Sequence, residues 1–146
     1  MKKIYVCYLL CLSVMMSYAQ EKNKSITSIN TTKTVVPFID QLQNGEKFTV
    51  HYKSTGCFHS NNENMTFQRE NDVYFVICNK QKKKLTADFM ESIRNFETEL
   101  AQKHDLGCTT VDNYLVIYND VHRVITDGSC NWNGYQKLKK LFGFVA

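Results

Sequence analysis

No stretch of this chain is apolar for long enough to cross a bilayer. Its longest apolar run, residues 4–16, is shorter than the roughly 20 residues that a membrane-spanning helix requires. The sequence also lacks a Cys-x-x-Cys pair, Gly-x-Ser-x-Gly, a phosphate-binding glycine-rich loop and His-Glu-x-x-His. No motif therefore supports a membrane span, a dithiol redox centre, a serine hydrolase, a nucleotide-binding loop or a zinc protease.

A strong excess of one charge is missing as well. The formal net charge of +4 falls to +2 when Lys2 and Lys3 are left out. Such a modest charge does not indicate nucleic-acid binding, which usually requires a concentrated basic face. One local cluster, between a predicted strand and a predicted helix, is basic: Lys80, Lys82, Lys83 and Lys84. We interpret it as a solvated loop; the alternative is a contact for an acidic partner or an anionic surface.

The start of the chain has the pattern of a secretory signal. Two lysines precede the apolar run, and Ser17-Tyr18-Ala19 places small residues where a signal peptidase recognises them. We therefore predict a signal peptide over residues 1–19 and export to the periplasm or the extracellular space. The polar residues 20–34 are predicted to be a flexible leader.

Residues 35–146 are predicted to form a single α+β domain, with a mainly antiparallel five-stranded sheet and helices on one face. The expected order is α-βββ-α-ββ-α. Hydrophobic periodicity places helices near residues 37–42, 89–100 and 135–142, and strands near 48–53, 65–68, 73–78, 114–118 and 121–126. In the long helix, Phe89, Ile93, Phe96 and Leu100 recur at steps of 4, 3 and 4, which predicts one buried face.

The cysteines predict two disulfides. Cys7 and Cys11 lie in the signal, which leaves Cys57, Cys78, Cys108 and Cys130. Four cysteines allow three pairings, and sequence alone does not choose among them. The up-and-down order of the predicted strands favours Cys57–Cys78 at one end of the sheet and Cys108–Cys130 at the other. Each bridge would contribute about 3 kcal/mol to stability.

Neither a metal site nor a catalytic site is predicted. Cys57, His59 and His51 lie near one another in sequence, but no second ligand pair completes a tetrahedral zinc site. Two histidines and a lysine suffice for acid–base cleavage of RNA, yet no spacing brings His51 and His122 together. We therefore assign no catalytic residue, no metal and no cofactor.

Aromatic residues offer the best candidates for a contact surface. The segment Gly56-Cys57-Phe58-His59 is predicted to be a projecting loop, and tyrosine and tryptophan tend to anchor interfaces. The candidate contact residues are Phe58, His59, Tyr52, Tyr74 and Trp132.

The segment Ser17-Tyr18-Ala19-Gln20-Glu21 resembles the signal-peptide ends of small exported proteins of Bacteroidota. This resemblance covers about twenty residues, as expected for a cleaved signal, and it implies export without implying a function. Segments 52–59 and 127–132 resemble family motifs, but we assign them to no characterised family.

The sequence thus favours a non-catalytic binding or interaction module of the periplasm or cell surface. Its partner is expected to be a protein or another cell-envelope component, not nucleic acid. One alternative is a small secreted hydrolase or nuclease, which would need two titratable side chains converging in a cleft. Another is a small-ligand carrier, which would need an apolar cavity of roughly 300 Å³ between helix and sheet.

Overall fold

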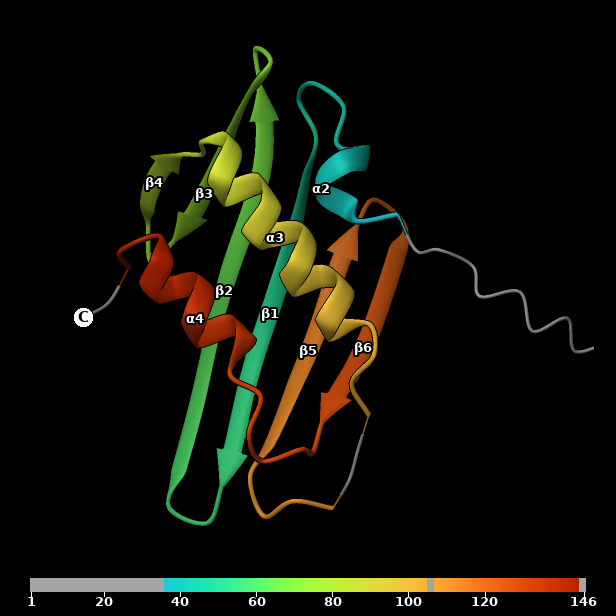
Figure 1. The fold of residues 1–146 in the computed structure, drawn as a ribbon, viewed down its shortest axis with the longest axis vertical. Coiled ribbons are helices and arrows are strands. Elements are labelled where there is room, and N and C mark those ends of the chain that lie inside the picture. Colours follow the sequence, from blue (N-terminus) through green and yellow to red (C-terminus); the bar gives the residue numbers. More distant parts are fainter. Residues whose placement is uncertain (1–35, 105–106, 145–146) are drawn as a thin grey trace, which may run out of the picture. The chain divides into compact units, whose positions relative to one another are not determined.

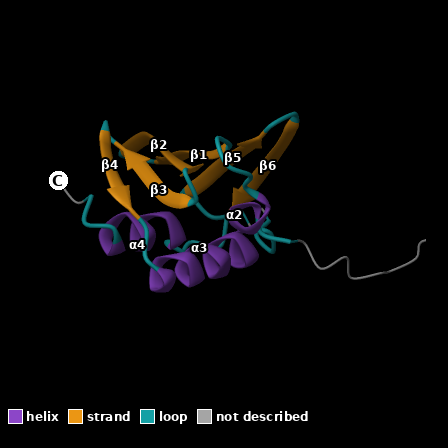
Figure 2. Cartoon of the chain, turned by 90° about the horizontal axis from the view of Figure 1, so that it is seen from above, coloured by secondary structure: helices purple, strands orange, loops and turns teal. Residues whose placement is uncertain are grey.

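In the described part of the chain, six antiparallel strands form one sheet, and three helices cover one of its faces (Figures 1 and 2). The computed structural model describes residues 36–104 and 107–144, so the predicted signal peptide and the whole of the predicted leader lie outside the described residues. The strands are β1 (Lys47–Gly56), β2 (His59–Glu70), β3 (Val73–Cys78), β4 (Gln81–Lys84), β5 (Val111–Tyr118) and β6 (Val121–Asp127), in the spatial order β4-β3-β2-β1-β5-β6. The helices are α2 (Phe38–Gln41), α3 (Ala87–Leu100) and α4 (Gly134–Leu141). The predicted α+β class with helices on one face is confirmed.

The predicted count of five strands is wrong, because the lysine cluster that we interpret as a solvated loop forms β4. The hairpin between β3 and β4 turns through Asn79 and Lys80, whose φ angles of 51° and 65° are both positive. Two positive φ angles are what a type I′ turn needs, and asparagine tolerates them better than most residues. The lysine cluster therefore continues the sheet as an edge strand.

The second strand is also longer than its apolar pattern predicts. All of β2 from His59 to Gln68 pairs with β1, yet its first six residues, His59–Asn64, contain no apolar side chain. This half of β2 extends past β3, which pairs only with Met65–Glu70. Backbone pairing with β1 and the 2.7 Å ion pair of Glu63 with Lys139 of α4, not burial of an apolar face, therefore hold the extension.

Helices α3 and α4 pack their apolar stripes on the sheet. The predicted stripe of α3 is confirmed: Ile93, Phe96 and Leu100 are buried, and Phe89 is half-buried against the same core. In α4, Tyr135 and Leu138 are buried, whereas Leu141 is 47% exposed. No described helix has both the length and the apolar character that a membrane crossing needs.

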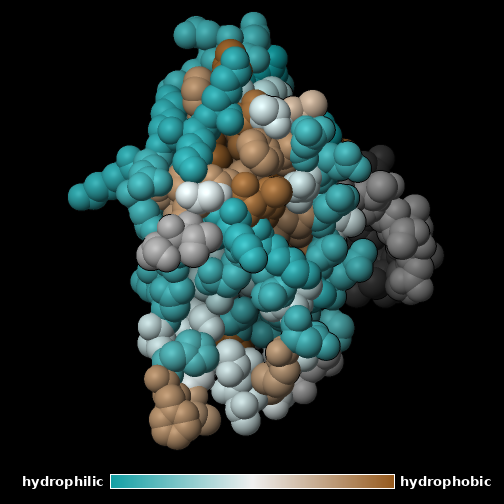
Figure 3. Space-filling model, turned by 60° about the vertical axis from the view of Figure 1, so that its left-hand side comes forward, coloured by the Kyte–Doolittle hydropathy of each residue, from teal (hydrophilic) through white to brown (hydrophobic). Residues whose placement is uncertain are grey.

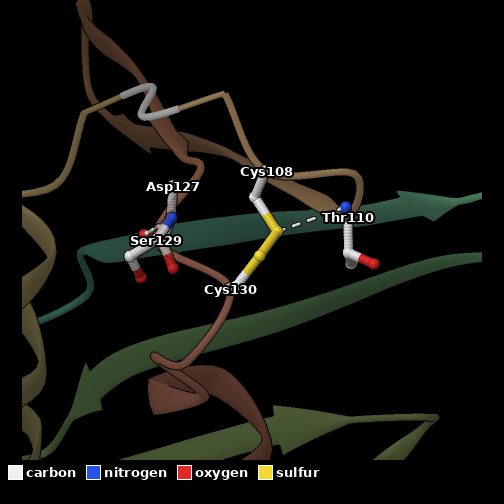
Figure 4. The surroundings of a disulfide bond; sticks show 5 residues. All are labelled: Cys108, Thr110, Asp127, Ser129 and Cys130. Atoms are coloured by element: carbon white, nitrogen blue, oxygen red, sulfur yellow. Dashed lines mark hydrogen bonds between the residues drawn. A yellow bond between two sulfur atoms is a disulfide. The ribbon is translucent and has the colours of Figure 1, made fainter.

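One of the two predicted disulfides is present. Cys108 and Cys130 are bonded, with their Cα atoms 5.6 Å apart, at the end of the sheet where β5 begins and β6 ends (Figure 4). The backbone N–H of Thr110 donates a hydrogen bond to Cys108 Sγ, and the N–H of Ser129 donates to Asp127 Oδ1. These contacts order the two loops that the bridge joins.

The predicted Cys57–Cys78 bridge is wrong. Cys78 is buried opposite Met65, whereas Cys57 is exposed in the turn beyond His59. The six-residue extension of β2 separates the two cysteines by roughly 20 Å along the strand, far beyond the Cα separation of a disulfide. Both thiols are free.

The short helix α2 is attached to α3 through Glu97. Its carboxylate accepts hydrogen bonds from the backbone N–H groups of Phe38, at 2.6 Å, and Ile39, at 3.0 Å. Burial raises the pKa of Glu97 to about 7; the two N–H donors and Arg123 oppose this rise, and the charge of Asp40 adds to it. Arg94 neutralises part of the Asp40 charge through a 2.9 Å ion pair.

We expect the free energy of unfolding to fall as the pH rises through the interval between 4.5 and 7. The folded state holds the Glu97 proton more tightly than the unfolded chain, whose carboxyl has a pKa of 4.5, so deprotonation favours unfolding. The loss is at most about 2 kcal/mol between pH 5 and pH 7, since this side chain is only partly buried. Urea denaturation at both pH values measures it. Glu97→Gln should remove most of this pH dependence, and an unchanged slope would contradict the assignment.

Candidate binding surface

The face of the sheet opposite the helices has no covering element among the described residues (Figure 2). On β1 the buried side chains Phe48, Val50 and Tyr52 point to the helices, and the residues between them point the other way. The strand registers extend this alternation across the sheet. We call this second set the uncovered face: Lys47, Thr49, His51, Lys53, Thr55, Ser60, Asn62, Asn64, Thr66, Gln68, Glu70, Val73, Phe75, Ile77, Lys82, Lys84, Val111, Asn113, Leu115, Ile117, His122, Val124 and Thr126.

The uncovered face is basic, although the whole protein is only mildly so. It carries four lysines and one carboxylate, Glu70, which is already ion-paired with Lys82. The three helices together carry five carboxylates against four cationic side chains. Positive charge is therefore concentrated on the side of the domain that the helices leave open.

Hydrogen bonds between neighbouring strands hold the polar side chains of this face in place. Thr49 Oγ1 lies 3.0 Å from Thr66 Oγ1, and His51 Nδ1 lies 2.7 Å from Asn64 Oδ1. These pairs are directly opposite in the β1–β2 register. Because the side chains are already ordered, a partner that binds here loses less conformational entropy on binding.

A hollow of about 380 Å³ lies where β1 begins and β5 ends. The uncovered-face residues Lys47, Thr49 and Ile117 line it, together with Gly45, Glu46 and Asn119. The Glu46 carboxylate accepts hydrogen bonds from the Gln43 N–H and, at 2.8 Å, from the Tyr118 hydroxyl, and these bonds lower its pKa. Glu46 is thus engaged within the protein, whereas Lys47 is exposed.

The tip of the β1–β2 hairpin projects an apolar side chain into solvent. Phe58 is fully exposed in the two-residue turn, next to the exposed thiol of Cys57. Figure 3 shows apolar atoms projecting at the lower end of the molecule, where Figure 1 places this hairpin. His59 belongs to the same tip, and its Nε2 lies 3.0 Å from Ser54 Oγ.

The other three candidate contact residues lie on the helix-covered side. Tyr52 is buried, with its ring 4.4 Å from that of Tyr135. Tyr74 is half-buried beneath the Arg69 guanidinium, and Trp132 is half-buried and donates a 2.7 Å hydrogen bond to Glu99. The five residues therefore do not share one surface: only Phe58 and His59 are brought together.

A group of acidic and phenolic side chains lies beneath α4 and the disulfide. Asp112 and Asp127 are opposite each other on β5 and β6, and the Tyr52 hydroxyl donates to Asp112 over 3.3 Å. Burial and the nearby Asp112 carboxylate raise the pKa of Tyr114. Because Tyr114 is 1% and Asp127 3% exposed, this arrangement is part of the core and does not form a cleft that a substrate could enter.

The space between α3 and the sheet is also nearly filled. A cavity of about 20 Å³ there is lined by Val50, Phe96, Glu97, Leu100 and neighbouring side chains. That volume is enough for about one water molecule. A small-ligand carrier would need a space more than ten times larger.

Within residues 36–104 and 107–144, no group of three or more His, Cys, Asp and Glu side chains is arranged to hold a metal ion. No protein-family model matches this chain, and comparison with curated proteins finds no match. The uncovered face is not among the sites predicted from the sequence, because that prediction gives weight to aromatic residues. In the sequence, this face is marked by the polar residues Thr49, His51 and Lys53, which alternate with the buried side chains of β1.

Proposed function

We propose that this protein is an exported, non-catalytic binding module whose uncovered face binds an acidic protein partner. The observation that carries the proposal is the concentration of four lysines on a hydrogen-bonded polar face that no described element covers. Opposite charge on the partner would steer association and select among partners.

Apolar side chains on both sides of the polar centre favour a protein partner over a small anion. Phe75 and Ile77 flank it on β3, and Leu115 and Ile117 flank it on β5; all four are half-buried. Lys82 extends over the Phe75 ring, with its Nζ 4.3 Å from the centroid. An interface with charged and apolar contacts of this kind is typical of protein recognition.

The export that we propose for this protein rests on the predicted signal peptide. The Cys108–Cys130 disulfide supports it, since such bonds persist mainly in oxidising compartments.

Reversing two lysines of β1 tests the binding face. Lys47 and Lys53 are exposed and stand beside neutral neighbours, among them Gln68, Asn62 and Asn113. We expect Lys47→Glu/Lys53→Glu to weaken binding to immobilised poly-L-glutamate, a probe for acidic protein segments, by about tenfold or more. Biolayer interferometry at two salt concentrations measures the change.

The matched control is Lys137→Glu/Lys140→Glu, which makes the same change in net charge on exposed positions of α4. It should retain most of the binding. Equal losses in both variants would show that net charge alone is responsible, and no loss in either would show that the uncovered face is not the binding site.

A further inference from the structure

The two edges of the sheet are built differently. The β4 edge is four residues long and includes three consecutive lysines, which is a common protection against pairing with another strand. The β6 edge is seven residues long, Val121–Asp127, and contains neither lysine nor proline. Of the five large apolar side chains that are exposed in the described part of the chain, two lie on β6: Val121 at 45% and Val124 at 75%. The charged side chains of β6, Arg123 and Asp127, both lie on the helix-covered side. The outer side of this edge therefore lacks the lysines that protect β4.

The register shows which backbone groups of β6 are free. Tyr118 and Val121 flank the two-residue turn between β5 and β6, so they form a hydrogen-bonded pair. In an antiparallel ladder such pairs alternate with non-bonded ones. The N–H and C=O groups of His122, Val124 and Thr126 therefore point away from β5, and no described residue bonds to them.

We propose that β6 pairs antiparallel with β6 of a second copy of this chain, about a twofold axis at Val124. Only in this register do the free backbone N–H and C=O groups of His122, Val124 and Thr126 all find partners in the other copy. The pairing forms about six interchain hydrogen bonds. It places Val124 opposite its own counterpart and His122 opposite Thr126 of the other copy. The exposed valine is then covered by an equivalent valine, and no like charges are opposed.

The distribution of charge permits a second copy to bind in this way. The lysines of the uncovered face stand on β1 and β4, and neither β5 nor β6 contains a lysine. Pairing through β6 thus keeps the basic strands of the two copies apart. It would also join the two uncovered faces into one continuous surface; this inference does not depend on what that surface binds.

A cysteine at the proposed axis tests the register directly. Opposed residues in a hydrogen-bonded antiparallel pair have Cα atoms about 5.5 Å apart, which lies within the range of a disulfide. In a Cys57→Ser background, which removes the exposed thiol, Val124→Cys should form a covalent dimer under mild oxidation. Thr126→Cys alone should not, but an equal mixture of Thr126→Cys and His122→Cys chains should. Failure of Val124→Cys to cross-link would overturn the proposal.

Sedimentation equilibrium on the otherwise unaltered protein provides the second test. One added strand pair buries less than a standard interface, so we expect a dissociation constant that is about micromolar or weaker. Val124→Lys should weaken the dimer by about tenfold or more, because it opposes two lysines at the axis. Leu141→Lys, at an exposed apolar position on α4, should leave it unchanged. A monomer at all concentrations up to about 500 µM, or a dimer that Val124→Lys leaves intact, would overturn the β6 interface.

Discussion

Loss of the Cys108–Cys130 disulfide is expected to destabilise the domain by about 3 kcal/mol, which corresponds to a fall in melting temperature of roughly 10 °C. The bridge closes a loop across 22 positions of sequence that includes the whole β5–β6 hairpin. Without it, the unfolded chain gains conformational freedom, and the loop before β5 is no longer held against the loop after β6. Thermal unfolding with and without dithiothreitol, followed by circular dichroism, measures the loss.

The free cysteines provide the control for this experiment. A Cys108→Ser/Cys130→Ser variant should melt at the temperature of the reduced protein and should not respond to dithiothreitol. Cys57→Ser should melt like the wild type, because the Cys57 side chain is exposed and unbonded. A melting temperature that reduction leaves unchanged would show that the bridge contributes nothing, and a large loss in Cys57→Ser would show that this thiol has a partner in solution.

The parts of the fold that bury apolar side chains are predictable from the sequence. The spacing of Ile93, Phe96 and Leu100 by itself identifies the covered face of α3. Alternation of Phe48, Val50 and Tyr52 likewise identifies the covered face of β1. In both cases the periodicity of the element and the burial of its side chains have the same cause, namely contact with the core.

Strands that are held by backbone pairing and polar side-chain contacts, without a buried apolar face, are not predictable from hydrophobic periodicity. All four residues of β4 are exposed, and the first half of β2 has no apolar residue. Such strands leave no hydrophobic period in the sequence, because their neighbours β3 and β1 determine where they lie. The wrong length of β2 leads to the wrong disulfide, since a shorter strand would place Cys57 beside Cys78.

The candidate binding surface is not predicted from the sequence, for a related reason. Aromatic residues are a common mark of interfaces, but here Tyr52 and Tyr114 alternate with the polar positions and belong to the core. What marks the uncovered face is the concentration of Lys47, Lys53 and Lys84 on one side of several strands. Which side chains gather on one face depends on the register between strands. Strand pairing determines this register, and the periodicity within a single strand does not reveal it.

Leu100→Ala is expected to lower the free energy of unfolding by about 3–4 kcal/mol. Leu100 is 2% exposed at the end of α3, and it already lines the cavity of about 20 Å³ between this helix and the sheet. Truncation would enlarge that cavity, and residues such as Val50 and Val116 are held by strand pairing and cannot move far enough to fill it. The loss of stability therefore has two parts, the lost burial of the side chain and the cavity that remains.

Leu141→Ala provides the matched control, because Leu141 is 47% exposed and its truncation should lower the free energy of unfolding by less than about 1 kcal/mol. Urea denaturation of both variants measures the difference, and equal stabilities would show that α3 does not pack on the sheet through this face.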